Sequence, residues 1–349
     1  MPLACFRADA SVTTGTGHLM ECLTLASFLG RTFSSGSLFL VNGFPPALRV
    51  LDGQGYRYRI VPPGLSDAEE QAWISGILGE TGAWLLACNL LGRGDGFYAG
   101  LRGRGARLMV ILDDGIPRPT PGDIVVNWSI LQEESYYAGF AGDGTRYCIG
   151  PRFMPMREGL HERWLRPREI PDRVRSIFVN QGGSDPFGLT AGILRALELL
   201  DLPQEIVVVV GGAVTDRHRE ELISLGEHAR NSYTFAWGVP PQEMEDLMER
   251  SDLAITAAGN TLYELALFGV PSLIVCHHER HQAVAERFAG MGAAVNLGIG
   301  TGLPPETIAG AVGKLLGDRA KRQALSERMK GIVDGLGCHR IAEALGGAW

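Results

Sequence analysis

The sequence lacks the features of a secreted or membrane protein. Its six cysteines stand alone along the chain, and no two of them form a CxxC pair. This spacing is typical of reduced thiols and not of a zinc site or a disulfide framework. The opening MPLACFRADASV does not follow the basic-then-apolar order of a signal peptide. No apolar run approaches the ~20 residues of a membrane span. We therefore expect a cytoplasmic protein without a membrane span.

The sequence also lacks excess positive charge and repetition. Its formal net charge is −7 at pH 7 and its isoelectric point is near 5.7, so a nucleic acid is not expected as the main partner. No internal repeat or low-complexity segment is present. Hydrophobic residues make up 45% of the chain and charged residues 20%, which is typical of a globular protein. Because 349 residues exceed what one core usually serves, we expect two domains.

Short apolar runs alternate with helical patterns along both halves of the chain. The predicted strands are 3–7, 38–41, 58–61, 84–88, 108–112, 123–127, 176–180, 206–210, 233–236, 253–256, 273–276 and 293–296. The predicted helices are 18–30, 47–54, 66–78, 97–103, 187–200, 215–226, 241–250, 260–268 and 283–290, and the end of the chain, 304–349, is mostly helical with breaks near 317 and 335–337. This alternation predicts an α/β protein with two Rossmann-like, doubly wound parallel sheets.

A proline-rich segment with mixed charges separates the two halves. Pro155, Pro167 and Pro171 indicate a linker because proline interrupts regular structure. We therefore place an N-terminal domain at 1–154, the linker at 155–171 and a C-terminal domain at 172–349.

The segment 251–282 contains a candidate ligand site. A buried strand is followed by the Ala-Ala-Gly turn 257–259 and by a helix that Asn260 or Thr261 can cap. Such a turn leaves helix N–H groups open to an anion, and Glu264, one turn further on, can accept hydrogen bonds from a sugar diol. The spacing fits a nucleotide site. An ordinary strand–helix–strand unit with a surface glutamate explains it equally well.

Two further glycine-rich turns follow predicted strands. Gly183 and Ser184 lie in the run Gln-Gly-Gly-Ser-Asp-Pro, whose backbone N–H groups can approach a phosphate without side-chain obstruction. Near the start of the chain, Gly17 precedes His18, which opens a helix after a loop of Ser, Thr and Gly. The positive end of the helix dipole disfavours the imidazolium, so the ring can act as a general base. A histidine hydrogen-bonded to loop carbonyls is the alternative.

Three sequence motifs resemble those of a known enzyme family. They are RADAS followed by GTGH in the first half, and NQGGSDP and AAGNTLYEL followed by HQ in the second. Together they resemble the UDP-sugar hydrolases of pseudaminic acid biosynthesis (the UDP-2,4-diacetamido-2,4,6-trideoxy-altropyranose hydrolase family). That family is part of the glycosyltransferase-B (GT-B) superfamily, which includes the lipid II-forming N-acetylglucosaminyltransferases. The resemblance spans nearly the whole chain. It implies the GT-B fold, with the last helix packing back on the first domain.

The resemblance also implies roles for individual residues. His18 matches the catalytic base, Glu264 matches the residue that holds the ribose hydroxyls, and the small-residue turns match the binding site of the UDP pyrophosphate. Gly238 and Val239 fall where related enzymes hold the uracil ring. The expected substrate-binding residues are Gly17, Glu21, Gly183, Ser184, Gly238, Val239, Gly259, Asn260, Thr261, Glu264, Arg280, His281 and Gln282. If His18 is not the base, Asp9 in the same loop is the next candidate.

Two positions depart from the pattern of this family. Glu21 stands where the family carries arginine, and His281 stands where it usually carries asparagine, while the following Gln282 is retained. A charge reversal one helical turn from the base points to a different sugar or acceptor. Arg280 can pair with a uronic carboxylate, and Glu21 can accept a hydrogen bond from an amino-bearing acceptor such as a heterocyclic base.

The acidic pair Asp113-Asp114 ends the fifth predicted strand and is the candidate for a Mg²⁺ site beside the diphosphate. The family carries an acidic pair here and is thought to work without metal, so the resemblance implies a structural or substrate-orienting role. We therefore expect no metal, and no cofactor other than the UDP-sugar substrate.

These features together predict an inverting enzyme that cleaves the anomeric C–O bond of a UDP-sugar through an oxocarbenium-like transition state and releases UDP. With water as the acceptor it is a nucleotide-sugar hydrolase, which is the favoured interpretation. With a small organic acceptor it is a UDP-sugar glycosyltransferase, for example a uronosyl transferase. A UDP-binding protein without catalysis is the third interpretation.

Overall fold

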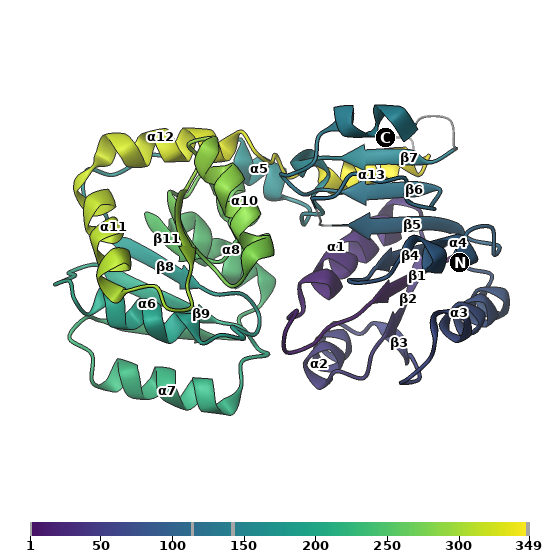
Figure 1. Cartoon of the computed structure of the whole chain (residues 1–349), viewed down its shortest axis with the longest axis horizontal. Helices are drawn as coiled ribbons and strands as arrows, with labels where there is room; N and C mark the ends of the chain where they lie inside the picture. Colours follow the sequence, from purple (N-terminus) through teal and green to yellow (C-terminus); the bar gives the residue numbers. More distant parts are fainter. Residues whose placement is uncertain (1, 113–114, 141–143, 347–349) are drawn as a thin grey trace. The chain divides into compact units, whose positions relative to one another are not determined.

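The computed structural model describes residues 2–112, 115–140 and 144–346. They form two compact units (Figure 1). The first unit consists of the start of the chain to Ser11, then Thr16–Leu160, and the segment from Gly335 onward. The second unit consists of Val12–Gly15 and His161–Asp334. None of the described helices is both long enough and apolar enough to cross a membrane.

The first unit is built on a seven-stranded parallel sheet in the order β3-β2-β1-β4-β5-β6-β7. Its strands are β1 (Leu3–Ala8), β2 (Gly36–Val41), β3 (Arg57–Ile60), β4 (Leu85–Asn89), β5 (Arg107–Leu112), β6 (Ile124–Asn127) and β7 (Arg146–Ile149). The central strands are buried along almost their whole length, as expected for a sheet covered on both faces. The strand order reverses between β1 and β4, which makes that place a topological switch point.

Helices complete the first unit. They are α1 (Gly17–Thr32), α2 (Pro45–Gly53), α3 (Asp67–Thr81), α4 (Asp95–Leu101), the 3-10 helices η1 (Glu134–Phe140) and η2 (Pro151–Phe153), and α13 (Gly337–Ala344). α3 begins with a capping box, in which the Ser66 side chain accepts from Glu69 N and the Glu69 carboxylate accepts from Ser66 N. α13, near the end of the chain, packs against α1, η2 and β7.

The predicted end of the first helix at Gly30 is wrong. α1 continues to Thr32, and its last turns carry the buried Phe28 and Leu29. Their packing outweighs the cost of about 1 kcal/mol that glycine adds inside a helix. A Cβ at position 30 would lie 3.3 Å from the carbonyl oxygen of Ser35, so glycine here allows a close approach of the backbone after the helix.

The second unit is built on a six-stranded parallel sheet in the order β10-β9-β8-β11-β12-β13. Its strands are β8 (Ser176–Asn180), β9 (Glu205–Val210), β10 (Tyr233–Trp237), β11 (Leu253–Thr256), β12 (Ser272–Cys276) and β13 (Val295–Ile299). Its helices are α5 (Leu160–Trp164), α6 (Leu189–Leu197), α7 (Asp216–Glu227), α8 (Pro241–Arg250), α9 (Asn260–Phe268), α10 (Glu279–Gly290), α11 (Pro305–Gly317) and α12 (Arg319–Lys330). The strand order reverses between β8 and β11, the second switch point.

The predicted fold class is confirmed, because both sheets are parallel and doubly wound with helices between the strands. The sequence did not predict the two 3-10 helices, and it also did not predict one strand and one α-helix. β7 begins with an exposed arginine and a half-buried tyrosine, so its sequence shows no apolar run. The short helix α5 lies within the segment expected to be a linker.

Candidate functional site

The carboxyl ends of β8 and β11 meet at the switch point of the second unit, and Asn180 joins the loops that follow them. Its side-chain nitrogen donates to the Val209 carbonyl at 2.8 Å. Its side-chain oxygen accepts from Gly182 N at 3.0 Å and from the Thr261 hydroxyl at 3.3 Å. The glycine-rich turn after β8 and the first turn of α9 therefore lie side by side.

The N-terminus of α9 differs in one detail from the prediction. The N-cap residue is Gly259, and no side chain caps the helix, so capping by Asn260 or Thr261 is wrong. The Thr261 hydroxyl bonds to Asn180 instead. α9 has nine residues, and only glycine caps its start. The positive end of its helix dipole is therefore at the switch point, which suits an anion.

The turn after β8 is formed by residues with unusual backbone angles. Gly182 has φ +77° and Asp185 has φ +41°. The buried Asp185 carboxylate accepts from Leu189 N at 2.8 Å and Thr190 N at 2.9 Å, which are the first N–H groups of α6. α6 begins at Leu189, two residues after its predicted start, and its first two N–H groups are bonded to Asp185. At this turn, phosphate binding by the backbone N–H groups of Gly183 and Ser184 therefore stays a prediction about the loop and not about a helix N-terminus.

Glycine at position 211, after β9, allows another loop to approach this turn closely. A Cβ there would lie 2.2 Å from the Gly183 carbonyl oxygen, so any side chain would force the two loops apart. The same carbonyl accepts from Ala213 N at 3.0 Å. The Gly183 carbonyl is thus turned toward the β9 loop.

His277 and Gln181 connect the loop after β12 to the same turn. His277 Nε2 lies 3.1 Å from Gln181 Oε1, and both residues are buried. Burial lowers the pKa of His277 below its usual value, the charge of Asp185 offsets part of this, and His278 lowers the pKa further. His277 is therefore a neutral ring near pH 7. Gln181 lies in the NQGGSDP motif, but the sequence alone does not indicate a role for it, because its burial and its partner are tertiary features.

The expected substrate-binding residues Arg280, His281 and Gln282 lie within a helix and not ahead of it. α10 begins at Glu279, four residues before its predicted start. The His281 ring lies 4.2 Å from that of His278 and 5.3 Å from that of His277, measured between centroids. Gln282 donates to Glu286 Oε1 at 3.0 Å.

The remaining predicted residues of the second unit lie on α9 and after β10. Glu264 is half-buried one turn into α9. Gly238 has φ +54° and donates its N–H to the Val210 carbonyl at 2.8 Å, and Val239 is half-buried after it. Beside them, the guanidinium of Arg219 lies 4.5 Å from the ring centroid of Trp237, a cation–π contact.

His18 and Glu21 lie in the first turns of α1, at the switch point of the first unit. Asn89, the last residue of β4, donates to the His18 carbonyl at 3.4 Å and to Glu21 Oε2 at 2.8 Å. The Trp128 indole donates to the same carboxylate oxygen at 3.2 Å. Glu21 is only 3% exposed. Its carboxylate thus holds the start of α1 against the ends of β4 and β6, and sequence reasoning missed Asn89 and Trp128 as its partners.

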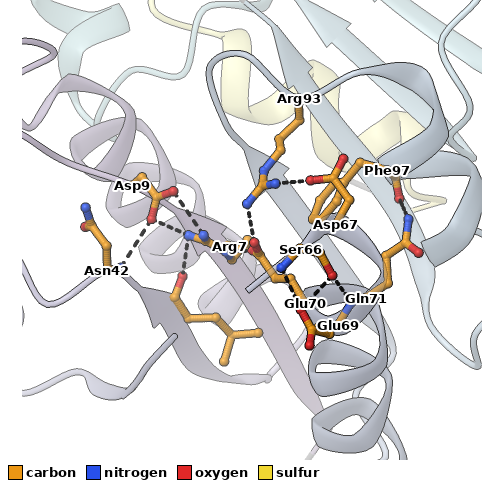
Figure 2. Close-up of polar contacts among 11 residues, drawn as sticks. Arg7, Asp9, Asn42, Ser66, Asp67, Glu69, Glu70, Gln71, Arg93 and Phe97 are labelled. Atoms are coloured by element: carbon orange, nitrogen blue, oxygen red, sulfur yellow. Dashed lines mark hydrogen bonds and ion pairs between the residues drawn. The ribbon is translucent and has the colours of Figure 1, made fainter. Parts of the chain in front are cut away.

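Asp9 belongs to a network of charged side chains (Figure 2). Both of its carboxylate oxygens accept from the buried Arg7, at 2.5 and 2.9 Å, and one also accepts from Asn42 N at 3.2 Å. Arg7 also donates to Glu70 at 2.7 Å, and Glu70 accepts from Arg93. Burial alone would lower the pKa of Arg7, but the hydrogen bonds and charges of Asp9 and Glu70 raise it. Asp9 as an alternative base is therefore not supported, because the arginine occupies both oxygens.

The acidic pair at 113–114 lies outside the described residues. Among residues that are described, no group of three or more His, Cys, Asp or Glu side chains is arranged to hold a metal ion.

No family model matches the chain. The chain is 29% identical over 229 residues to the spore coat polysaccharide biosynthesis protein SpsG of Bacillus subtilis, an alignment that covers 64% of each protein. It is 23% identical over 272 residues to the pseudaminic acid cytidylyltransferase and UDP-2,4-diacetamido-2,4,6-trideoxy-beta-L-altropyranose hydrolase of Helicobacter pylori, covering 76% of this chain and 43% of that protein. The chain thus spans less than two thirds of the length of these relatives.

Solved structures resemble the whole chain. MurG of Acinetobacter baumannii matches with a TM-score of 0.69 at 16% identity, covering 99% of this chain and 100% of MurG. Phytolacca americana UGT2, complexed with UDP-2fluoro-glucose and pterostilbene, matches with a TM-score of 0.67 at 14% identity, covering 99% of both chains. These neighbours are glycosyltransferases of the GT-B type. Together with the two doubly wound parallel sheets, this likeness shows that the chain has the GT-B fold.

Proposed function

We propose that this protein is an enzyme that cleaves a UDP-sugar at its anomeric carbon and releases UDP. The observation that carries the proposal is the convergence of three loops at the switch point of the second unit, held together through Asn180 and through the Gln181–His277 pair. Ligands of open parallel sheets bind at such points. The glycine-capped start of α9 and the glycine-rich turn supply N–H groups suited to a diphosphate, and Glu264 lies one turn away, where it can accept from the ribose hydroxyls.

The chemistry requires a proton acceptor and a stabilised leaving group. In a single displacement, the oxygen of the nucleophile bonds to C1, the bond from C1 to the phosphate oxygen breaks with its electron pair, and the configuration at C1 inverts. We propose that His18 accepts the proton of the nucleophile. His18 lies at the N-terminal end of α1, beside the switch point of the first unit. Backbone N–H groups directed at the diphosphate offset its developing charge.

Water is the favoured nucleophile. The similarity to a protein named as a UDP-sugar hydrolase supports this choice, as do the motifs shared with that family. The second candidate is transfer of the sugar to a small acceptor, supported by the structural likeness to UGT2, a protein solved in complex with UDP-2fluoro-glucose and pterostilbene. A UDP-binding protein without catalysis is the third candidate.

One assay separates these candidates. The enzyme is incubated with a panel of UDP-sugars, with and without candidate acceptors, and UDP release is measured. Release in buffer alone identifies water as the nucleophile, and release only with an added acceptor identifies a transferase. UDP binding without release under either condition leaves the binding protein. If UDP neither binds nor is released from any of these sugars, the proposal is wrong.

A further inference from the structure

The side-chain amide of Gln181 is buried with only one of its two ends bonded. Gln181 is 1% exposed, and its Oε1 lies 3.1 Å from His277 Nε2. Its Nε2 has no hydrogen-bond partner within the described part of the protein. A buried amide nitrogen carries two donor hydrogens and is destabilising when neither is bonded, so this atom is suited to a ligand with acceptor oxygens.

In the structure, the amide oxygen of Gln181 faces His277 Nε2, which leaves the amide nitrogen as the available end. The neutral His277 ring has one N–H, and with the proton on Nε2 it donates to Gln181 Oε1. Protonation of the ring would leave Nε2–H in place, so the amide keeps its orientation in both charge states. The available end of Gln181 is therefore a hydrogen-bond donor. A single donor suits an anion better than the edge of a nucleobase, which presents an acceptor beside a donor.

The neighbours of Gln181 differ from it in how their polar groups are used. Asn180 bonds at both ends of its amide to protein groups, and Gly182 N bonds to Asn180. The Asp185 carboxylate is bonded to the start of α6, which moderates its repulsion of an anion. Thr256, opposite Asn180 in the β8–β11 register, is fully buried, and its hydroxyl also lacks a hydrogen-bond partner among the described residues. Two unbonded polar groups thus lie where the switch point is built.

We propose that Gln181 Nε2 donates a hydrogen bond to a phosphate oxygen of a bound nucleoside diphosphate, and that His277 positions the amide for this contact. The inference rests on the proposed function, because it assigns the diphosphate of that same ligand to the turn after β8. It adds a side-chain donor to the backbone N–H groups of the turn. His277 is a positioning residue in this scheme and does not touch the phosphate.

Calorimetry with UDP and with uridine tests the contact. Gln181→Met keeps the length of the side chain and removes the donor, so UDP affinity should fall about tenfold or more while uridine affinity stays unchanged. Gln181→Glu keeps an acceptor for His277 and places a negative charge beside the phosphate, so UDP affinity should fall further. The matched control is Gln204→Met. Gln204 directly precedes β9 and so lies at the amino ends of the strands, whereas the switch-point loops follow their carboxyl ends. This substitution should leave both affinities unchanged.

The role of His277 is tested with His277→Phe, which keeps a ring beside Phe187 and His281 but removes the donor to Gln181. UDP affinity should fall, and adding Gln181→Met to this variant should cost less than it does alone, because the two residues act as one unit. Equal and additive losses would show that His277 does not position the amide.

A measurement on the unaltered protein covers the case in which the variants fail to fold. The side-chain amide signals of Gln181 in a ¹⁵N spectrum should shift when UDP is added and should not shift with uridine. If the wild-type protein binds UDP but these signals stay in place, or if Gln181→Met binds UDP normally, the inference is wrong and the proposed function stands. If the wild-type protein binds no UDP, the proposed function itself is wrong.

Discussion

Asp9 and Glu21, the two candidate acidic residues of the first unit, differ in what surrounds them, and these surroundings decide their roles. Asp9 binds Arg7 through both carboxylate oxygens, and Glu21 accepts from Asn89 and Trp128. The sequence identifies both residues as unusual because they stand beside a candidate base. It does not reveal their partners, which come from strands and loops up to 107 residues away. A buried carboxylate with several donors stabilises local structure.

Arg7→Met should destabilise the protein strongly. The substitution leaves Glu70, which is 1% exposed, and Asp9 without their shared guanidinium, and breaking a buried ion pair costs about 3–5 kcal/mol. Urea denaturation measures the loss. The control is Arg59→Met, which removes an exposed pair with Glu80 and should destabilise the protein far less, because water screens exposed ion pairs. Equal losses in the two variants would show that the network in Figure 2 stabilises the protein no more than an exposed ion pair does.

His277 should make stability depend on pH. Its pKa is lowered in the folded protein, mainly by burial, so the unfolded chain binds the proton more tightly. The contribution to stability is present above the usual pKa near 6.5 and is lost as the pH falls from there toward the folded value. Urea denaturation at pH 7.5 and 5.5 should show a smaller drop for His277→Phe than for the parent. The exposed His228, changed to Phe, serves as the control. Identical drops in all three proteins would contradict the assignment.

At the scale of elements, the bounds of a helix or strand could be predicted best where its residues are buried against the rest of its unit. The bounds predicted for β11 and α8 agree with the structure, because an uninterrupted apolar run and a proline-started helix are local signals. The start of α10 was missed by four residues, since its first turn is rich in charge and histidine and contains few buried residues. The same holds for β7 at the edge of its sheet. A hydrophobic pattern in the sequence indicates which residues are buried, and elements at the edge of a sheet or on its surface have few buried residues.

The start of α9 leads to a prediction about the ribose. Glu264 lies one turn into this helix, and its carboxylate can accept two hydrogen bonds from a diol. Glu264→Ala should therefore weaken UDP binding by about 1.5–3 kcal/mol, as measured by calorimetry. Glu243→Ala, at an exposed position in the first turn of α8, is the control and should have no effect. A Glu264→Ala protein with the parent's affinity would remove Glu264 from the site.

At the scale of the whole molecule, the two units repeat one architecture, and each carries polar residues at its switch point. The sequence was sufficient to predict two doubly wound sheets and the loops that follow their strands. It was insufficient to identify the contacts that hold those loops together, such as those of Asn180, Asn89 and Gln181. Those contacts join residues distant in sequence, and no local pattern encodes them.

We expect EDTA to leave turnover unchanged, because the N–H groups at the start of α9 and the amide of Gln181 can offset the charge of a diphosphate. Steady-state UDP release with and without EDTA measures this. Loss of activity in EDTA and its recovery with Mg²⁺ would contradict the expectation and make Asp113 and Asp114 the first candidate ligands.

The assignment of His18 is tested by comparing rate and binding in one variant. In His18→Ala, the rate of UDP release from the substrate that the panel identifies should fall by about 10²–10⁴-fold, the usual range for the loss of one general base. Its affinity for UDP, measured by calorimetry on the same preparation, should stay unchanged, because the proposed nucleotide site is built by the second unit. A His18→Ala protein that releases UDP at the parent's rate would contradict the proposed mechanism.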